Sequence, residues 1–177
     1  MILYCMTQYS LKEGLKMFKQ LGINATMEEL QQLHLRDSFE PMIPKEMTRQ
    51  EKHEALESLM FLKKKRCGRI KGRTCADGRP QQKCIPKEDA ASPTVSLEGV
   101  LLTAVVDAEE GRDIAVVDIP NAFVQTKNVD KVTMKMRGKL AELMVLMAPE
   151  MHRKAIILEH GKPVLHVRLL GLSLIHI

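Results

Sequence analysis

The chain is poor in aromatic residues: Phe, Tyr and Trp make up only 3% of its 177 residues, and Trp is absent. Twelve methionines and an apolar fraction of 45% remain to fill an interior. We therefore expect an aliphatic core rich in methionine. That apolar fraction excludes disorder throughout the chain, and the length predicts about one domain.

Cysteines and long apolar runs are also scarce. None of the four cysteines forms a CxxC pair, so we do not expect a structural zinc site, and reduced thiols inside a cell are the simpler interpretation. No apolar run approaches the roughly 18 residues of a membrane span. The first ten residues, MILYCMTQYS, lack the basic and apolar regions of a secretory signal. Together these features predict an intracellular protein without a membrane partner.

Positive charge is concentrated in one segment. The chain carries a net charge of +5, but residues 61–90 hold ten lysines and arginines against three acidic residues. The rest of the chain is therefore slightly acidic. A basic segment on such a body indicates a polyanionic partner for that segment.

Three S/T-x-x-E patterns predict helix starts in the first third of the chain, at Ser10, Thr26 and Thr48. We expect the first helix to end at Gly22 and the third to run through residues 48–66, with a short extended piece at residues 38–43 between the second and the third. His34 lies at the border of the second apolar stripe. A lone histidine there is more often a structural residue than a ligand.

The basic segment contains a turn signal. Asp77-Gly78 favours a two-residue hairpin turn, which predicts arms at residues 69–76 and 79–85, with Pro80 on an edge strand. Both sides of these arms are polar, so we expect the hairpin to face solvent or a charged ligand rather than the core.

The second half alternates between helical and extended patterns. A helix should begin after Ser96 and end at Gly111, burying Val100, Leu101, Ala104, Val105 and Ala108. The apolar run 113–118 predicts a strand covered on both faces. Further elements are expected as a strand at 131–136, helices at 138–147 and 150–158, and a strand at 163–169 after a Gly161-Lys162 turn. The predicted class is α+β.

Asp118 ends the predicted apolar strand, directly before Ile119-Pro120. A carboxylate held there suits a hard cation such as Mg²⁺, and the turn imposed by Pro120 could aim the Ile119 carbonyl at the same ion. The alternative is that Asp118 only caps the following helix.

The string DIPNAF at residues 118–123 resembles motif A of reverse transcriptases, in the D-[IV]-x-x-A-F form of copia-type retrotransposon polymerases. The order of features around it is also similar: a pair of helices, a basic stretch CGRIKGRTCADG, then SPTV, a helix and the motif-A strand. The resemblance covers about residues 7–169. It implies an incomplete right-hand polymerase, fingers plus part of the palm, with an antiparallel sheet and packed helices.

The resemblance also implies a division of the chain. Residues 1–66 would be the helical part of the fingers, 67–95 the basic fingers hairpin and 96–169 a partial palm with motif A. The resemblance fails after residue 169, so residues 170–177 are expected to be a truncated or non-native tail.

Residue roles follow from the resemblance. Asp118 would be the first catalytic carboxylate, bridging two Mg²⁺ (or Mn²⁺) ions with help from the Ile119 carbonyl. The incoming dNTP would lie over the turn, with Phe123 as the steric gate against ribose, and it would contact a set of five residues: Arg69, Arg73, Asn121, Ala122 and Phe123. Three further basic residues would attract the template or simply form a solvated face: Lys71, Arg79 and Lys83.

The resemblance is incomplete. The second catalytic element of the family, an aromatic-x-Asp-Asp hairpin, does not occur in these 177 residues, so this chain alone should not polymerise. Its expected partners are an RNA or DNA template-primer, dNTP and the rest of a Pol polyprotein, including the remaining palm and RNase H. The expected location is intracellular, in cytoplasmic virus-like particles or in the nucleus. Two alternatives stay open: a non-catalytic basic nucleic-acid-binding module, and an unrelated Mg²⁺-dependent phosphotransferase.

Overall fold

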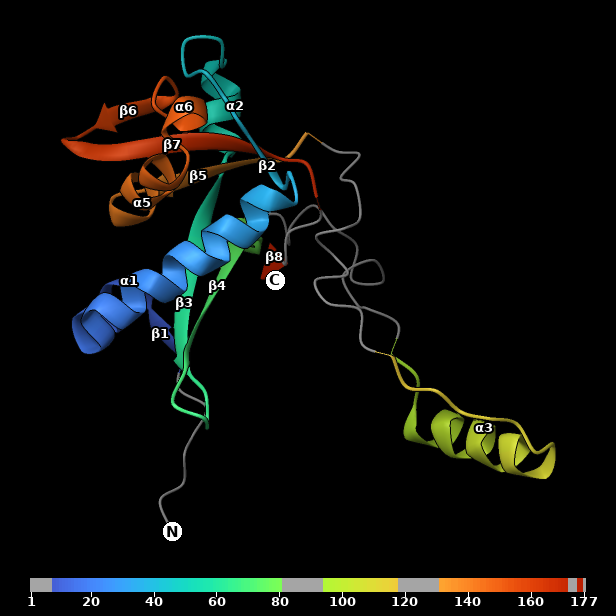
Figure 1. The fold of residues 1–177 in the computed structure, drawn as a ribbon. Coiled ribbons are helices and arrows are strands. Elements are labelled where there is room, and N and C mark those ends of the chain that lie inside the picture. The colour runs from blue at the N-terminus through green and yellow to red at the C-terminus, as the bar shows by residue number, and fades with distance from the viewer. Residues whose placement is uncertain (1–7, 81–93, 118–130, 172–174, 177) are drawn as a thin grey trace.

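The computed structural model describes residues 8–80, 94–117, 131–171 and 175–176 (Figure 1). Its helices are α1 (Leu11–Leu35), α2 (Arg49–Glu54), α3 (Leu97–Glu109), α5 (Lys139–Met147) and α6 (Pro149–His152). Its strands are β1 (Gln8–Ser10), β2 (Phe39–Pro41), β3 (Leu56–Lys64), β4 (Ile70–Asp77), β5 (Thr133–Arg137), β6 (Ile156–Glu159), β7 (Lys162–Leu169) and β8 (Ile175–His176).

The strands form one sheet in the order β2-β7-β5-β3-β4-β8, with β1 also paired to β3 and β6 to β7. Most pairs are antiparallel, but β3 with β5 and β4 with β8 are parallel. The predicted α+β class is confirmed. The expectation of an antiparallel sheet is wrong at these two pairs, because β3 runs in the same direction as β5 and β4 runs in the same direction as β8.

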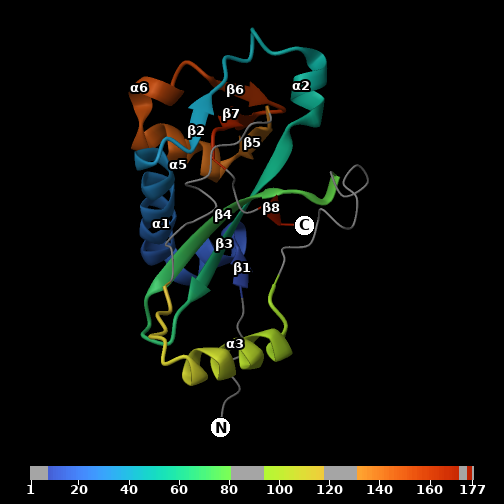
Figure 2. The same ribbon diagram turned by 90° about the vertical axis from the view of Figure 1, so that its right-hand side faces the viewer.

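Helices α1, α5 and α6 lie together on one side of the sheet, whereas no residue of α2 is buried (Figure 2). The main core lies between these three helices and the sheet, where successive strand residues alternate between the two faces.

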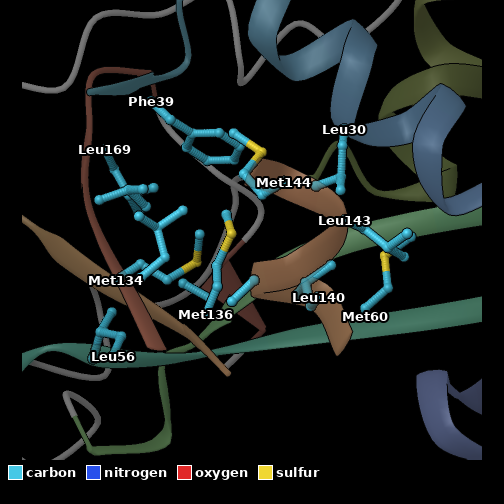
Figure 3. Close-up of a cluster of buried hydrophobic side chains, with 14 of the residues drawn as sticks. Leu30, Phe39, Leu56, Met60, Met134, Met136, Leu140, Leu143, Met144 and Leu169 are labelled. Carbon is cyan, nitrogen blue, oxygen red and sulfur yellow. The ribbon is translucent and has the colours of Figure 1, made fainter. Parts of the chain in front are cut away.

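Methionine fills much of this core, as the composition predicts. Met60, Met134, Met136 and Met144 are buried among leucines and valines, and Phe39 is the aromatic residue of the cluster (Figure 3). The unbranched thioether side chains adapt to the irregular space between α5 and the sheet.

The two helices predicted at the start are one element, α1, with a break at Lys19, whose φ is 48° and ψ −122°. Ser10 caps it as expected by accepting the Glu13 N–H. The prediction that Gly22 ends a helix and Thr26 caps another is wrong. Gly22 is buried against Leu62, and the Thr26 hydroxyl donates to the Gly22 carbonyl at 2.8 Å inside the helix.

The prediction of a long helix over residues 48–66 is also wrong beyond the first turns of that helix. The capping box of Thr48 and Glu51 is confirmed, but α2 ends at Glu54 and β3 begins at Leu56. The spacing of leucines in β3 fits both a helix and a strand. Pairing with β1, β4 and β5 decides for the strand.

The hairpin is displaced from its predicted place. It joins β3 to β4 through a turn in which the Gly68 N–H donates to the Lys65 carbonyl, with Gly68 at φ 81°. Asp77 is the last residue of β4 and Gly78 follows it, and the second predicted arm lies outside the described residues apart from Arg79 and Pro80, which are not in a strand. The prediction that neither face is core is wrong as well, because Gly72 and Thr74 are buried.

The second half follows the sequence more closely. The strand at 131–136, the helix at 138–147 and the strand at 163–169 are confirmed as β5, α5 and β7. The prediction of a helix over residues 150–158 is wrong, because this stretch contains the end of the short helix α6 and most of strand β6. The β6–β7 turn is His160-Gly161, both at positive φ, and not Gly161-Lys162.

Helix α3 begins after Ser96 as predicted, with the Ser96 hydroxyl accepting the Gly99 N–H, and Gly111 follows its end at φ 64°. None of its residues is buried, so the predicted buried face is wrong (Figure 1). The strand predicted at 113–118 is absent from its described part, residues 113–117, where Val116 is 97% exposed.

Candidate nucleic-acid interface

The β3–β4 hairpin carries most of the described basic residues of the charged segment. Its register pairs Phe61 with Arg73 and Lys63 with Lys71. Because side chains alternate along a strand, the even-numbered residues of both strands share one face and the odd-numbered residues share the other.

Helix α1 covers the even-numbered face. Leu62 is fully buried there, and a Cβ placed on Gly72 would lie 2.8 Å from the Ala25 carbonyl oxygen. The absence of a side chain at Gly72 therefore lets α1 pass directly over β4. This contact holds the hairpin rigidly against the helix.

Glu29 of α1 fixes the edge of β4. Its carboxylate accepts the Thr74 N–H at 3.2 Å. Burial raises the pKa of Glu29 above its ordinary value, against the lowering effects of this hydrogen bond and of the nearby cations Lys71, Arg73 and Arg36. A strand N–H at the sheet edge is thus satisfied by a helix side chain.

The odd-numbered face is basic and exposed near the turn, whereas Cys75 and Asp77 farther along it are buried. It presents Lys63, Lys71 and Arg73, with Phe61 beside Arg73, and none of the three cations forms an ion pair with another described residue. Like charges directly opposite each other in a sheet are destabilising. A row of phosphates would remove this repulsion.

Two of the predicted arginines lie elsewhere. Arg69, in the turn, donates to Glu28 of α1 at 2.9 Å and so points to the helix side of the hairpin. Arg79 is held by Asp77 through two guanidinium hydrogen bonds, which raise the pKa of Arg79. The structure therefore brings together Lys71 and Arg73, but it does not bring Arg69 or Arg79 to their face.

A hollow of about 170 Å³ lies between α1 and the start of β4. Its charged lining is mixed: Glu28, Glu29, Lys65, Arg69 and Lys71. Because both signs are present, the hollow attracts a polyanion less than the open face does.

The predicted metal site, and the part of the predicted nucleotide site that belongs to residues 118–123, lie outside the described residues. This applies to Asp118, Ile119, Asn121, Ala122 and Phe123, and also to Lys83. Within the described ranges, no group of three or more His, Cys, Asp or Glu side chains could hold a metal ion.

Sequence reasoning missed Lys63 as a member of this face, because residues 63–66 looked like a basic helix end. No local signal separates the two states, helix and strand, because Phe61 is apolar like Met60 and Leu62, so residues 60–63 do not alternate between polar and apolar side chains.

In the described part of the chain no helix is long and apolar enough to cross a membrane. Comparison of the chain with protein-family models, with curated proteins and with solved structures gives no match. The argument for function therefore depends on the residues of the chain itself.

Proposed function

We propose that this chain is the fingers and partial palm of a copia-type retrotransposon reverse transcriptase, a fragment of a Pol polyprotein that is inactive alone. The observation that carries the proposal from the structure is the basic odd-numbered face of the β3–β4 hairpin. It adds to the DIPNAF string of residues 118–123.

In this proposal the hairpin binds nucleic acid and nucleotide. Lys63, Lys71 and Arg73 attract template phosphates, and Arg69 exchanges Glu28 for the triphosphate of the incoming dNTP. A guanidinium suits that exchange because it offers paired donors to phosphate oxygens. The exposed ion pair with Glu28 is weak enough to be replaced, since such pairs contribute about 0–1 kcal/mol.

The chemistry in the proposal belongs to residues 118–123. Asp118, with the Ile119 carbonyl, would hold Mg²⁺, which supplies charge stabilisation for nucleotidyl transfer when bound. Asn121 and Ala122 would lie under the nucleotide, and Phe123 would exclude ribose. The remaining carboxylates, the rest of the palm and RNase H would come from other parts of the polyprotein, in virus-like particles or the nucleus.

Primer extension tests this proposal, using the chain joined to its downstream coding sequence. Asp118→Asn should abolish extension while template-primer binding persists, and Phe123→Ala should admit ribonucleotides. Unchanged sugar selection would show that Phe123 is not the gate. A complete downstream sequence without an aromatic-x-Asp-Asp element would contradict the proposal as a whole.

The second candidate function is a non-catalytic nucleic-acid-binding module, and the same open face favours it because that face needs no metal. The two functions differ in their response to Mg²⁺. A module should bind nucleic acid without any Mg²⁺-dependent affinity for dNTP, whereas the polymerase fragment should lose such affinity on Asp118→Asn.

A further inference from the structure

Two histidines from distant parts of the sequence meet on the helical side of the sheet, away from the hairpin face. His34 lies in the last turn of α1 and His152 ends α6. Their ring centres are 6.3 Å apart, with ring planes at 65°. His34 is half-buried, whereas His152 is 0% exposed.

His152 has no hydrogen-bond partner among the described residues at either ring nitrogen, Nδ1 or Nε2. Leaving a buried polar group unpaired is costly, so native proteins rarely do so without a reason such as a bound ion. The edge contact with His34 does not supply that reason, because it pairs neither nitrogen of His152 with a donor or acceptor of the protein.

The surroundings of the ring favour its neutral form. Burial lowers the pKa of His152 below its ordinary value, and the neighbouring His34 lowers it further. A neutral imidazole offers a lone pair, which is the form that binds transition metals.

We propose that His34 and His152 together bind a borderline divalent transition-metal ion of the Zn²⁺ class, which joins the end of α1 to α6. A Zn–N bond of about 2.0–2.1 Å and a ring radius near 1.2 Å place two ring centres sharing one ion at most about 6.5 Å apart. The observed 6.3 Å lies inside this limit, where the N–Zn–N angle would be about 150°, and the ring centres must approach by about 1 Å to reach a tetrahedral angle.

The remaining coordination positions are left to water, which reaches the ion past the half-exposed His34. Within the described ranges no third His, Cys, Asp or Glu side chain completes the group. The site is therefore open, and its metal should exchange more readily than that of a closed structural zinc site. Because the ion binds only when α1 and α6 are in place, it also stabilises the folded chain.

Zinc chloride titrated into the full, metal-free chain tests the site, with histidine ring nitrogens followed by NMR. We expect the ring signals of His34 and His152 to shift together and saturate at one equivalent, while those of the exposed His53 stay unchanged. By calorimetry, His34→Gln and His152→Gln should each weaken binding about tenfold or more. His53→Gln should bind like the parent.

Zinc that leaves both ring signals unmoved, because a buried water satisfies His152 or because the metal binds only cysteines, would overturn the proposal. Undiminished calorimetric binding in both variants would do the same. His34→Gln keeps the test decisive if His152→Gln fails to fold, since His34 is only half-buried. The ring signals separate this result from the proposed function, because neither histidine belongs to the hairpin face.

Discussion

Gly72 lies where α1 passes closest to β4. A Cβ at this position would meet the Ala25 carbonyl oxygen at 2.8 Å and the Met60 methyl carbon at 2.7 Å. Met60 is buried and the helix backbone cannot easily retreat, because Leu62 of β3 packs against α1 beside it. The orientation of the hairpin therefore depends on this glycine.

Gly72→Ala should lower the free energy of unfolding by about 1–3 kcal/mol, because the added methyl overpacks the contact between α1 and β4. Urea denaturation measures the change. Gly99→Ala in α3 is the matched control: there the Cβ meets no backbone atom but two exposed side chains, Val95 at 2.9 Å and the Ser96 hydroxyl at 3.5 Å, and the better helix propensity of Ala should raise stability by about 0.5–1 kcal/mol. Equal effects of the two changes would contradict the packing described.

His152 and His166 make stability depend on pH. Burial lowers the pKa of both below the ordinary 6.5. The neighbouring groups for His152 are His34; for His166 they are Glu159, which raises the pKa, and Lys135, Lys52 and Arg137, which lower it. The unfolded chain therefore binds more protons than the native chain just below pH 6.5, so the free energy of unfolding falls as the pH drops through that range.

Denaturation midpoints between pH 7.5 and pH 5 check this dependence. Removing either buried histidine, as His152→Gln or His166→Gln, should flatten the decline, and His53→Gln at an exposed position should not. A decline of the same size in all four proteins would assign it to other groups.

At the scale of elements, β3 shows which parts of the fold can be predicted from the sequence and which cannot. The cap at Thr48, the start of α3 at Ser96 and the strands β5 and β7 are predictable, because each depends on local residues. The strand state of residues 56–64 is not, because their apolar spacing fits a helix equally well. Only pairing with β4 and β5, which are distant in sequence, decides it.

The basic face of the hairpin was likewise only partly predictable from the sequence. The basic charge of residues 61–90 is evident in the sequence, and Lys71 and Arg73 could be named from it. Their pairing with Lys63 and Phe61 required the register, and the engagement of Arg69 by Glu28 required the position of α1. Partners that a fold brings together from distant segments carry no local signal.

Leu62→Ala compares the core element β3 with α3. Leu62 is fully buried between β3 and α1, so its truncation should cost about 2–5 kcal/mol. Leu102 in α3 is 68% exposed, and Leu102→Ala should change the free energy of unfolding by no more than about 0.5 kcal/mol. A large loss at Leu102, seen by urea denaturation, would place α3 in the core after all.

At the scale of the whole molecule, the two faces of the β3–β4 hairpin differ in burial and charge. The face under α1 holds the methionine-rich core, while the opposite face carries unpaired cations. Three cations of the basic segment thus lie on one surface, and long-range attraction of a polyanion would bring it to the hairpin first.

The affinity of the chain for a primer-template duplex, followed by fluorescence anisotropy across salt concentrations, tests most directly whether the open hairpin face is the nucleic-acid interface. The triple change Lys63→Gln, Lys71→Gln, Arg73→Gln should weaken binding about tenfold or more and reduce the salt slope by up to about 3. The control triple Lys12→Gln, Lys16→Gln, Lys45→Gln removes the same charge from exposed sites elsewhere and should have a much smaller effect. Equal losses in the two triples would contradict the account, because binding would then follow net charge and not this face.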